Sequence, residues 1–231
     1  MDTIQTKPCA KCAKPFEFTI YEIMPTFHPA HCVACSVAIQ AEMLKIQCEE
    51  NKRKADEKLA MEWLALCPIR FRDSEESLLP QVSREAIEAW ASSETTNLAF
   101  IGPAGTCKTR AGFLALKMAH ESGERCEAIS HSALAETARD ASFGDNTEKA
   151  RQRMRALQKC DVLFVDDIGK PPSTERTDAD FEALIDYRYA HRLPTIWTSN
   201  AGGTWLASRF GADRGEPIVR RLAEDAIIAK I

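Results

Sequence analysis

The amino-acid sequence predicts an α/β protein with a five-stranded parallel sheet, preceded by a long helix and a small cysteine-rich domain. Three observations support this fold class. Two Cys-x2-Cys pairs lie within the first 35 residues, neither Gly nor Pro occurs from 36 to 66, and five short apolar runs alternate with helical stretches after residue 97. Short apolar strands separated by helices are typical of a parallel sheet covered on both faces. We therefore expect three parts, at residues 1–36, 37–66 and 67–231.

The composition narrows the classes of function. A chain of 231 residues has room for one sizeable domain and a small second one, since a domain holds roughly 100 to 200 residues. The net charge of -4 argues against a surface built as a whole to hold nucleic acid or an anionic membrane, so any such contact must be local. The sequence has no signal-like start and no run of 18 apolar residues. We expect a cytoplasmic protein with no membrane partner.

The first part, residues 1–36, is predicted to bind zinc. Four of the nine cysteines form two pairs separated by nineteen residues: Cys9 with Cys12, and Cys32 with Cys35. Each pair can turn two thiolates toward one tetrahedral ion, and four thiolates leave no open coordination position, which favours a structural zinc ion. His28 and His31 are close enough in sequence for a Cys3His set, and scattered buried thiols are the other alternative. A metal would stabilise a module too small for a core of its own. We expect the module to bind a protein or DNA.

The second part, residues 37–66, is predicted to be a helical connector. From residue 36 onward it consists mostly of good helix formers. Its middle, "CEENKRKADEK", is charged on all sides, and apolar residues gather at the two ends: Ile39, Met43 and Ile46, then Leu59, Trp63 and Leu66. The pattern suits a spacer whose ends dock on neighbouring domains, and equally an ordinary helix packed along the larger domain.

The third part contains a phosphate-binding loop. It lies between the apolar run "NLAFI" and the helical run "KTRAGFLALKMAHES", which is the strand-loop-helix context such a loop requires. One position departs from the pattern G-x-x-x-x-G-K-[ST], because Cys107 stands where a glycine is expected. A Cβ there costs roughly 1 kcal/mol if φ is positive. Lys108 would neutralise phosphate charge and Thr109 would bind Mg²⁺. The expected nucleotide-binding residues are Gly102, Pro103, Ala104, Gly105, Thr106, Cys107, Lys108 and Thr109.

Polar residues at the ends of two further strands complete the predicted site. The run "DVLFVDDIG" places two acids after an apolar strand, and we expect Asp166 to hold Mg²⁺ and Asp167 to orient the attacking water. The run "PTIWTSN" ends in Asn200, which can reach the terminal phosphate or the water. Near the chain end, "GEPIVRRLAED" carries Arg220 and Arg221, either surface charges or a source of an arginine finger for a neighbouring subunit.

From residue 67 to 231 the chain resembles the AAA+ ATPases of the helicase loader group, the DnaC and IstB type. The resemblance rests on the ordered set "PIRFRDSEES", "GPAGTCKT", "DVLFVDDIG", "YRYAHRLPTIWTSN" and "GEPIVRRL". It implies Lys108 and Thr109 as the Walker A pair, Asp166 as the Walker B magnesium acid, Asn200 as sensor 1 and Arg221 as the finger, with Arg220 as the fallback. Three departures matter: Cys107 replaces Gly, Asp167 replaces the usual Glu, and the sequence ends without a helical lid.

The resemblance implies an ATPase that grips a replicative DNA helicase through its N-terminal region, binds single-stranded DNA and forms a homo-oligomer through the arginine finger. Its expected cofactors are ATP or ADP, Mg²⁺ and Zn²⁺, and the shorter Asp167 implies slow hydrolysis. A basic stripe at Arg151, Arg155 and Lys159 is a candidate DNA contact, although it also suits a solvated helix face. Two alternatives stay open: a transposition helper ATPase of the IstB type, and a nucleotide-binding adaptor or helicase inhibitor without turnover.

Overall fold

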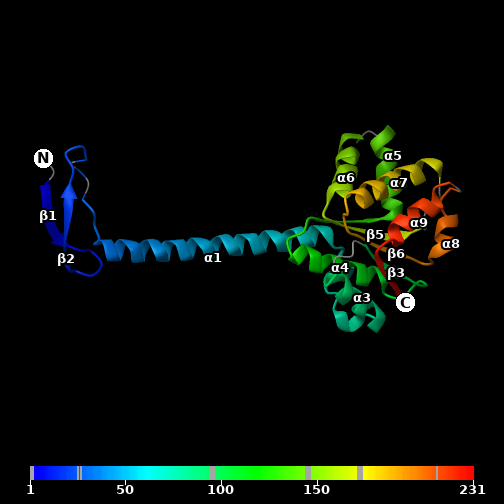
Figure 1. Ribbon diagram of the computed structural model, residues 1–231, viewed down its shortest axis with the longest axis horizontal. Coiled ribbons are helices and arrows are strands. Elements are labelled where there is room, and N and C mark those ends of the chain that lie inside the picture. The colour runs from blue at the N-terminus through cyan, green and yellow to red at the C-terminus, as the bar shows by residue number, and fades with distance from the viewer. Residues whose placement is uncertain are drawn as a thin grey trace. The chain divides into compact units, whose positions relative to one another are not determined.

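The computed structural model describes residues 3–24, 26, 28–93, 97–143, 147–170, 174–211 and 213–231. Contacts between residues divide the chain into two compact units, Met1–Lys58 and Leu59–Ile231. The boundary lies inside one long helix, α1 (Val33–Leu66), so the predicted connector contributes residues to both units. Figure 1 labels the elements.

The first unit contains a β-hairpin and the first three-quarters of α1. Strands β1 (Thr3–Pro8) and β2 (Pro15–Ile20) pair antiparallel, with Thr3 opposite Ile20. Helix α1 begins three residues before the expected start at residue 36, and the Ser36 amide donates to the Cys32 carbonyl at 2.9 Å. Every residue from 41 to 58 is exposed. This stretch of α1 therefore has no core of its own.

The second unit is built on a five-stranded parallel sheet with the strand order β4-β5-β6-β3-β7. The five predicted apolar runs form the five strands, which confirms the predicted fold class. Their bounds are β3 (Asn97–Ile101), β4 (Cys126–Ser130), β5 (Val162–Ile168), β6 (Thr195–Ser199) and β7 (Ala226–Lys230). All carboxyl ends meet at one edge of the sheet, which is where ligands bind in open α/β sheets.

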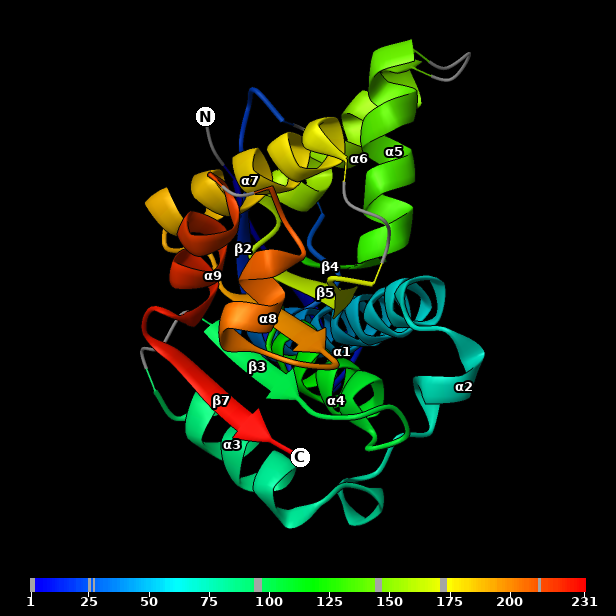
Figure 2. The ribbon, with the colours of Figure 1, turned by 90° about the vertical axis from the view of Figure 1, so that its right-hand side faces the viewer.

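Helices cover both faces of the sheet, as Figure 2 shows. One face packs against the end of α1, α3 (Gln81–Ala91) and α4 (Lys108–Glu121). The other packs against five helices: α5 (His131–Phe143), α6 (Thr147–Lys159), α7 (Glu175–Ala190), α8 (Gly203–Ser208) and α9 (Gly215–Ala223). Alternate residues of β3 enter the two cores, since Leu98 and Phe100 face the first and Ala99 the second.

The last two turns of α1 pack on the second unit's own helices. Trp63 is buried, its ring lies 5.7 Å from the ring of His120 in α4, and His120 Nε2 donates to the Leu59 carbonyl at 2.9 Å. A short helix α2 (Ile69–Arg72) and a 3-10 helix η1 (Glu76–Leu78) then lead into α3. None of the described helices is both long enough and apolar enough to cross a bilayer.

Candidate functional site

The predicted phosphate loop lies between β3 and α4 and lines a cavity of about 450 Å³. The cavity is where a parallel sheet, a glycine-containing turn and a helix N-terminus meet. That combination concentrates backbone N–H groups and the positive end of the helix dipole on one anion. The lining residues are Arg70, Phe71, Ala104, Gly105, Thr106, Cys107, Lys108, Thr109, Arg110, Asp167, Lys170 and Asn200.

Cys107 adopts the left-handed conformation that the missing glycine would adopt freely. Its φ is 63° and its ψ 16°, and Gly105 two residues earlier has a φ of 88°. The loop therefore keeps its turn at a cost in backbone strain, because a Cβ disfavours this region. The Cys107 side chain is exposed and lines the cavity. The substitution strains the loop without closing it.

Replacing Cys107 by glycine is expected to raise the free energy of unfolding by about 0.5–1 kcal/mol, because relief of the left-handed strain exceeds the entropy that glycine adds to the unfolded chain. Urea denaturation followed by circular dichroism measures the change. The matched control, Cys107→Ala, removes the thiol but keeps the Cβ, and its stability should stay near that of the wild type. A less stable glycine variant would contradict the strain argument.

Lys108 lies in the first turn of α4 with its side chain folded back over the loop. It is buried, and its Nζ donates to the Pro103 carbonyl at 2.7 Å. Burial lowers the pKa of the Lys108 ammonium, while the nearby carboxylates of Asp167 and Asp166 act in the opposite direction. A buried ammonium held by the Pro103 carbonyl is well placed to exchange that contact for a phosphate oxygen.

Three side-chain oxygen groups converge beside the loop. Thr109 Oγ1 donates to Asp166 at 2.9 and 3.1 Å from its two carboxylate oxygens, and Thr198 Oγ1 donates to Asp166 Oδ1 at 2.6 Å. Burial raises the pKa of Asp166, and Asp167 adds to the rise, while the hydrogen bonds from Thr198 and Thr109 lower it. A hydroxyl and a carboxylate are hard oxygen ligands that fit Mg²⁺. Thr109 and Asp166 therefore meet as the sequence predicts.

A β-bulge separates Asp166 from Asp167. Val165 pairs with Trp197 and Ile168 with Ser199, so the two acids of β5 lie opposite the single residue Thr198 of β6. The Thr198 hydroxyl accepts from the Asp167 amide at 2.8 Å while donating to Asp166. Thr198 thus contacts both acids. Sequence reasoning noted it only as part of the strand end before Asn200.

The Asp167 side chain is paired with a lysine that sequence reasoning missed. Lys170 Nζ lies 2.9 Å from Asp167 Oδ2, and both residues line the cavity. Hydrogen bonding and charge attraction from Asp167 raise the pKa of Lys170. The sequence signal that could have indicated this ion pair is the spacing of three residues between Asp167 and Lys170. Asn200 is exposed and lines the same cavity, as expected for a residue that follows β6.

The two arginines near the chain end lie outside the phosphate cavity. Arg221 belongs to α9, and its Nε lies 2.9 Å from Asp186 Oδ1 of α7 in the same chain. Arg220 is exposed. Both line a separate cavity of about 690 Å³ between α8 and α9. Neither arginine reaches the nucleotide site of its own chain, so a finger role requires a second chain.

Residues ahead of the α/β domain also reach the phosphate cavity. Arg72 donates to the Leu64 and Cys67 carbonyls at 2.6 and 3.0 Å, and Phe71 stacks on Phe113 of α4 with ring centroids 5.1 Å apart. These contacts hold α2 in place and leave Arg70 exposed on the cavity lining. The motif "PIRFRDSEES" marked this segment in the sequence, but no role was assigned to Arg70.

The four predicted metal ligands form one cluster in the first unit. The sulfur atoms of Cys9, Cys12, Cys32 and Cys35 all lie within 4.8 Å of one another. Cys12 and Cys32 are 3.9 Å apart, close to the roughly 3.8 Å that Zn–S bonds of 2.3 Å impose in a tetrahedron. Among the described residues the cluster includes neither His28 nor His31. The donor set therefore fits zinc.

Backbone groups of the cluster favour a thiolate. The Cys32 amide donates to Cys9 Sγ at 3.3 Å. Burial works to raise the pKa of Cys9, but amide donors from Cys12, Cys32 and Lys11 outweigh it and lower the pKa to about 5. Hydrogen bonds to Cys32 and Cys12 raise the pKa of Cys35 to about 12. Four such sulfurs cannot all lose their protons without a cation between them.

A phosphate loop after β3, joined through Thr109 to an acid at the end of β5, defines a P-loop nucleotide-binding protein. Comparison with protein families gives the narrower class. The model of the family described as "IstB-like ATP binding protein" matches residues 47–228. The chain therefore belongs to this family, of the IstB/DnaC AAA+ type, which confirms the resemblance noted in its motifs. No curated protein matched the sequence.

Solved structures share the fold. The structure of DnaI aligns with a TM-score of 0.60 and 20% identity over 71% of this chain and 94% of DnaI. The structure of the DnaC helicase loader aligns with a TM-score of 0.58 and 21% identity, over 71% of this chain and 99% of the solved DnaC chain. The structure of AMPPCP-bound DnaA from Aquifex aeolicus aligns with a TM-score of 0.51 and 22% identity over 65% of this chain. The chain spans 44% of the length of the DnaA structures.

Proposed function

We propose that this protein is an ATPase that loads a replicative DNA helicase onto single-stranded DNA. One observation carries the proposal: a single α/β unit brings Lys108, Thr109 and Asp166 together at a phosphate loop, in a chain that shares its fold with 99% of the solved chain of the DnaC helicase loader. A separate N-terminal unit with a cysteine cluster leaves the ATPase unit free to change its nucleotide state while a partner is held.

The residues of the cavity have complementary roles in nucleotide binding. Lys108 neutralises the phosphates, and Thr109 with Asp166 would hold Mg²⁺, which supplies charge neutralisation at the transferred phosphate. Asp167 orients the attacking water, and Asn200 contacts the water or the terminal phosphate. The Lys170 contact neutralises Asp167, and the Asp carboxylate is one methylene shorter than Glu. Both features support slow basal hydrolysis.

An arginine finger from a second copy would complete the site. Because Arg221 is tied to Asp186 within its own chain, it must exchange that ion pair to reach a neighbour's phosphate. Arg220 is exposed on the same helix and needs no such exchange. The position in the motif favours Arg221 as the arginine finger, whereas the exposure of its side chain favours Arg220. We therefore propose a homo-oligomer in which α9 faces the nucleotide of the next protomer.

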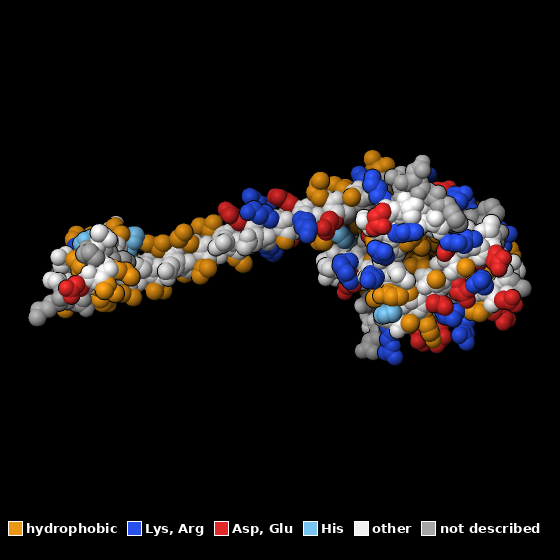
Figure 3. All heavy atoms as spheres, turned by 90° about the horizontal axis from the view of Figure 1, so that it is seen from above, with side chains coloured by type: hydrophobic (Ala, Val, Ile, Leu, Met, Phe, Trp, Pro, Cys, Tyr) orange, Lys and Arg blue, Asp and Glu red, His pale blue; other side chains and the backbone are white. Residues whose placement is uncertain are grey.

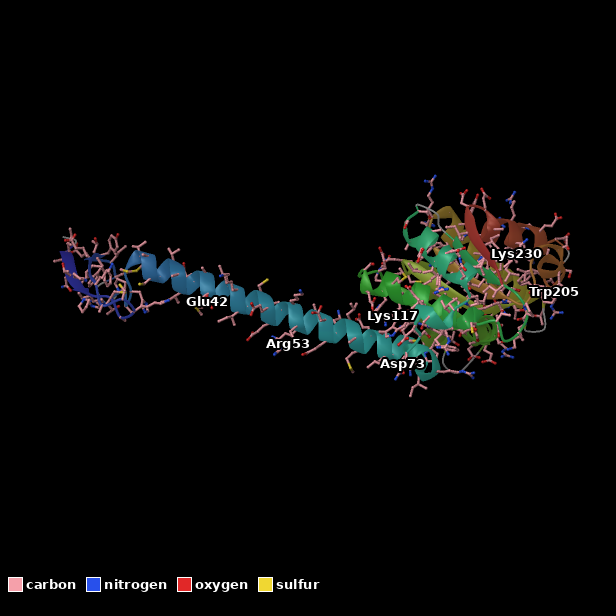
Figure 4. All side chains as sticks on the ribbon, turned by 90° about the horizontal axis from the view of Figure 1, so that it is seen from below. Glu42, Arg53, Asp73, Lys117, Trp205 and Lys230 are labelled. Carbon is pink, nitrogen blue, oxygen red and sulfur yellow. The ribbon has the colours of Figure 1, made fainter. Side chains whose placement is uncertain are left out.

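The first unit supports a protein-binding role. Figure 3 shows apolar side chains gathered over the hairpin and along the first half of α1. Large exposed apolar patches on soluble proteins mark interaction sites. Among the described residues of this unit, the large exposed apolar ones are Ile4, Tyr21, Ile23, Met24, Val33, Val37, Met43, Leu44 and Ile46. Farther along α1, most residues from 49 to 58 are charged and all are exposed. Figure 4 labels Arg53 in this stretch and Glu42 before it. We propose that the apolar part contacts the helicase.

Two basic surfaces support single-stranded DNA binding by the second unit. On α6, Arg151, Arg155 and Lys159 are exposed at a spacing of four residues, whereas Arg153 turns inward to pair with Glu127. Between α5 and the start of α7, a cavity of about 600 Å³ is lined by three cations and two acids: Arg139, Lys170, Arg176, Glu136 and Asp180. Lys170 pairs with Asp167 and Arg176 with Asp180, so Arg139 is the stronger candidate for a phosphate contact. Such cations can follow a phosphate backbone despite the acidic total charge.

Phosphate release from ATP tests the enzymatic part. Wild-type protein with Mg²⁺, helicase and oligonucleotide should release phosphate, and Lys108→Ala should lower the rate at least 100-fold, because the positive charge at the phosphates is lost. The matched control is Lys117→Ala, which should keep the rate. Lys117 lies near the other end of the same helix, where its partly exposed side chain pairs with Glu121. Nucleotide binding without turnover in the wild type would instead support the adaptor or inhibitor alternative.

DNA preference and helicase capture test the remaining part. If the protein is a helicase loader, the tagged full chain should capture a hexameric helicase. It should also bind single-stranded DNA with an affinity that falls steeply as the salt concentration rises. Two variants distinguish the candidate DNA surfaces. Arg151→Ala/Arg155→Ala removes two cations of the α6 stripe, and Arg139→Ala removes one cation of the cavity between α5 and α7. The IstB-like family match supports a transposition helper as the second candidate. Filament formation on duplex DNA with no helicase captured would favour that candidate.

A further inference from the structure

The turn that carries Asp167 is held in an unusual backbone conformation. Asp167 has a φ of 58° and Gly169 a φ of 87°, so two residues of this turn are left-handed. Non-glycine residues avoid this region, and Asp167 stays there only if its surroundings fix it. The Asp167 amide is fixed by Thr198, and the Ile168 carbonyl accepts from Ser199 Oγ at 2.9 Å. Both of these contacts come from β6.

Two side chains outside β6 hold the two peptide groups that flank Gly169. The Gly169 amide donates to His131 Nδ1 at 3.3 Å, and the Gly169 carbonyl accepts from Arg209 Nε at 3.0 Å. His131 begins α5 and Arg209 follows α8, so the two groups reach the turn from different elements. A Cβ at Gly169 would lie 2.9 Å from Leu206 Cδ1. The turn is therefore enclosed as well as hydrogen-bonded.

The surroundings of His131 favour a neutral ring that accepts the hydrogen bond from the Gly169 amide. It is 5% exposed, and its ring lies 4.6 Å from Phe181 and 5.8 Å from Phe210. Burial lowers the pKa of His131 to about 4, although the nearby Asp178 opposes the shift. The ring is therefore neutral at physiological pH, and Nδ1 is the unprotonated nitrogen because it accepts from Gly169.

We propose that His131 and Arg209 are positioning residues that orient the Asp167 carboxylate by clamping the two peptide groups that flank Gly169. The inference rests on the proposed ATPase function and extends it to two residues that touch neither nucleotide nor metal. Without the clamp, Asp167 relaxes out of the left-handed region and its carboxylate leaves the direction set by the bulge. Nucleotide binding, which depends on the phosphate loop, is unaffected.

The clamp is tested with two substitutions at one position. His131→Leu keeps the volume and removes the acceptor, whereas His131→Asn keeps an acceptor atom, Oδ1, on the carbon that bears Nδ1 in histidine. We expect the Gly169 amide to exchange with solvent about tenfold faster in the leucine variant and near the wild-type rate in the asparagine variant. The turnover number should fall about tenfold in the leucine variant and recover in the asparagine variant, with ADP affinity unchanged in both.

The control is His120→Leu, which removes a buried histidine on the other face of the sheet. It should lower stability without speeding exchange at Gly169. Arg209→Met tests the carbonyl side independently if the leucine variant does not fold. Unchanged Gly169 exchange in both His131→Leu and Arg209→Met, or exchange as fast in His131→Asn as in His131→Leu, overturns the proposal. A wild-type protein without phosphate release refutes the ATPase function, while amide exchange still decides the clamp.

Discussion

Replacing Arg188 with methionine is expected to lower the free energy of unfolding by about 3–5 kcal/mol, one of the largest effects that a single side chain of this protein can have. Arg188 lies in α7 and is 1% exposed. No carboxylate pairs with it in the described part of the chain. Its guanidinium instead donates to backbone carbonyls, including those of Leu157, Cys160 and Pro194 at 3.1, 2.9 and 2.5 Å.

The physical reason is that Arg188, near the end of α7, joins the end of α6 to the start of β6 at one buried point. Its carbonyl partners lie at the end of α6 and just before β6, and it also donates to Thr195 Oγ1 at 3.1 Å. The last carbonyls of a helix have no intrahelical partner, and the negative end of the helix dipole attracts a cation. Methionine fills the space but removes the guanidinium donors, and each buried carbonyl left without a donor costs about 1–3 kcal/mol. The Pro194 carbonyl is not among them, because it also accepts from the Leu163 amide at 3.1 Å.

Urea denaturation measures the change, and two variants separate its causes. Arg188→Lys keeps the charge but cannot form the planar fork of donors, so its stability should fall between wild type and methionine. Arg192→Met, at an exposed position just after the same helix, is the control and should change stability by less than about 0.5 kcal/mol. A methionine variant as stable as that control would contradict the role assigned to Arg188.

The sequence predicted the sheet and the phosphate loop because both depend on local patterns. The run "NLAFI" is apolar at every central position, and the structure buries Leu98, Ala99 and Phe100 completely. The spacing between Gly102 and Thr109 also fixes where the loop begins and ends. The hairpin of the first unit was not predicted. Strand β1 is mostly exposed and lacks apolar alternation, and although the run "FEFTI" of β2 alternates apolar and polar residues, one such short run gives no sign of the strand with which it pairs.

The residues that sequence reasoning missed are those placed by tertiary contacts. Thr198 meets both acids only because β5 carries a bulge, which slips the register by one residue where β5 pairs with β6. His131 and Arg209 lie 38 and 40 residues from Gly169, and no local pattern links them to it. Arg221 fits its motif, yet its pairing with Asp186 depends on how α9 packs on α7. Spacing identifies residues of one segment but not the contacts between segments.

Removing the metal is expected to unfold the hairpin and both Cys-x2-Cys pairs while leaving nucleotide binding intact. Purified protein should contain one zinc ion per chain, since structural zinc sites bind with apparent free energies of roughly 10–16 kcal/mol near neutral pH. None of the strand residues of the hairpin is fully buried, so little apolar burial would compensate for losing the ion. The metal content, the amide exchange of residues 3–24 and calorimetry with ADP measure the three expectations.

The same effect should follow from Cys12→Ser but not from Cys48→Ser. Both cysteines are exposed and belong to the first unit, yet only Cys12 is in the sulfur cluster. Loss of zinc and faster exchange in the Cys12 variant alone would assign the stability of this unit to the four-sulfur site. Equal zinc content in the two variants would mean that the cluster is not the binding site. Because the phosphate loop lies in the other unit, weakened ADP binding in Cys12→Ser would mean that the two units depend on each other for folding.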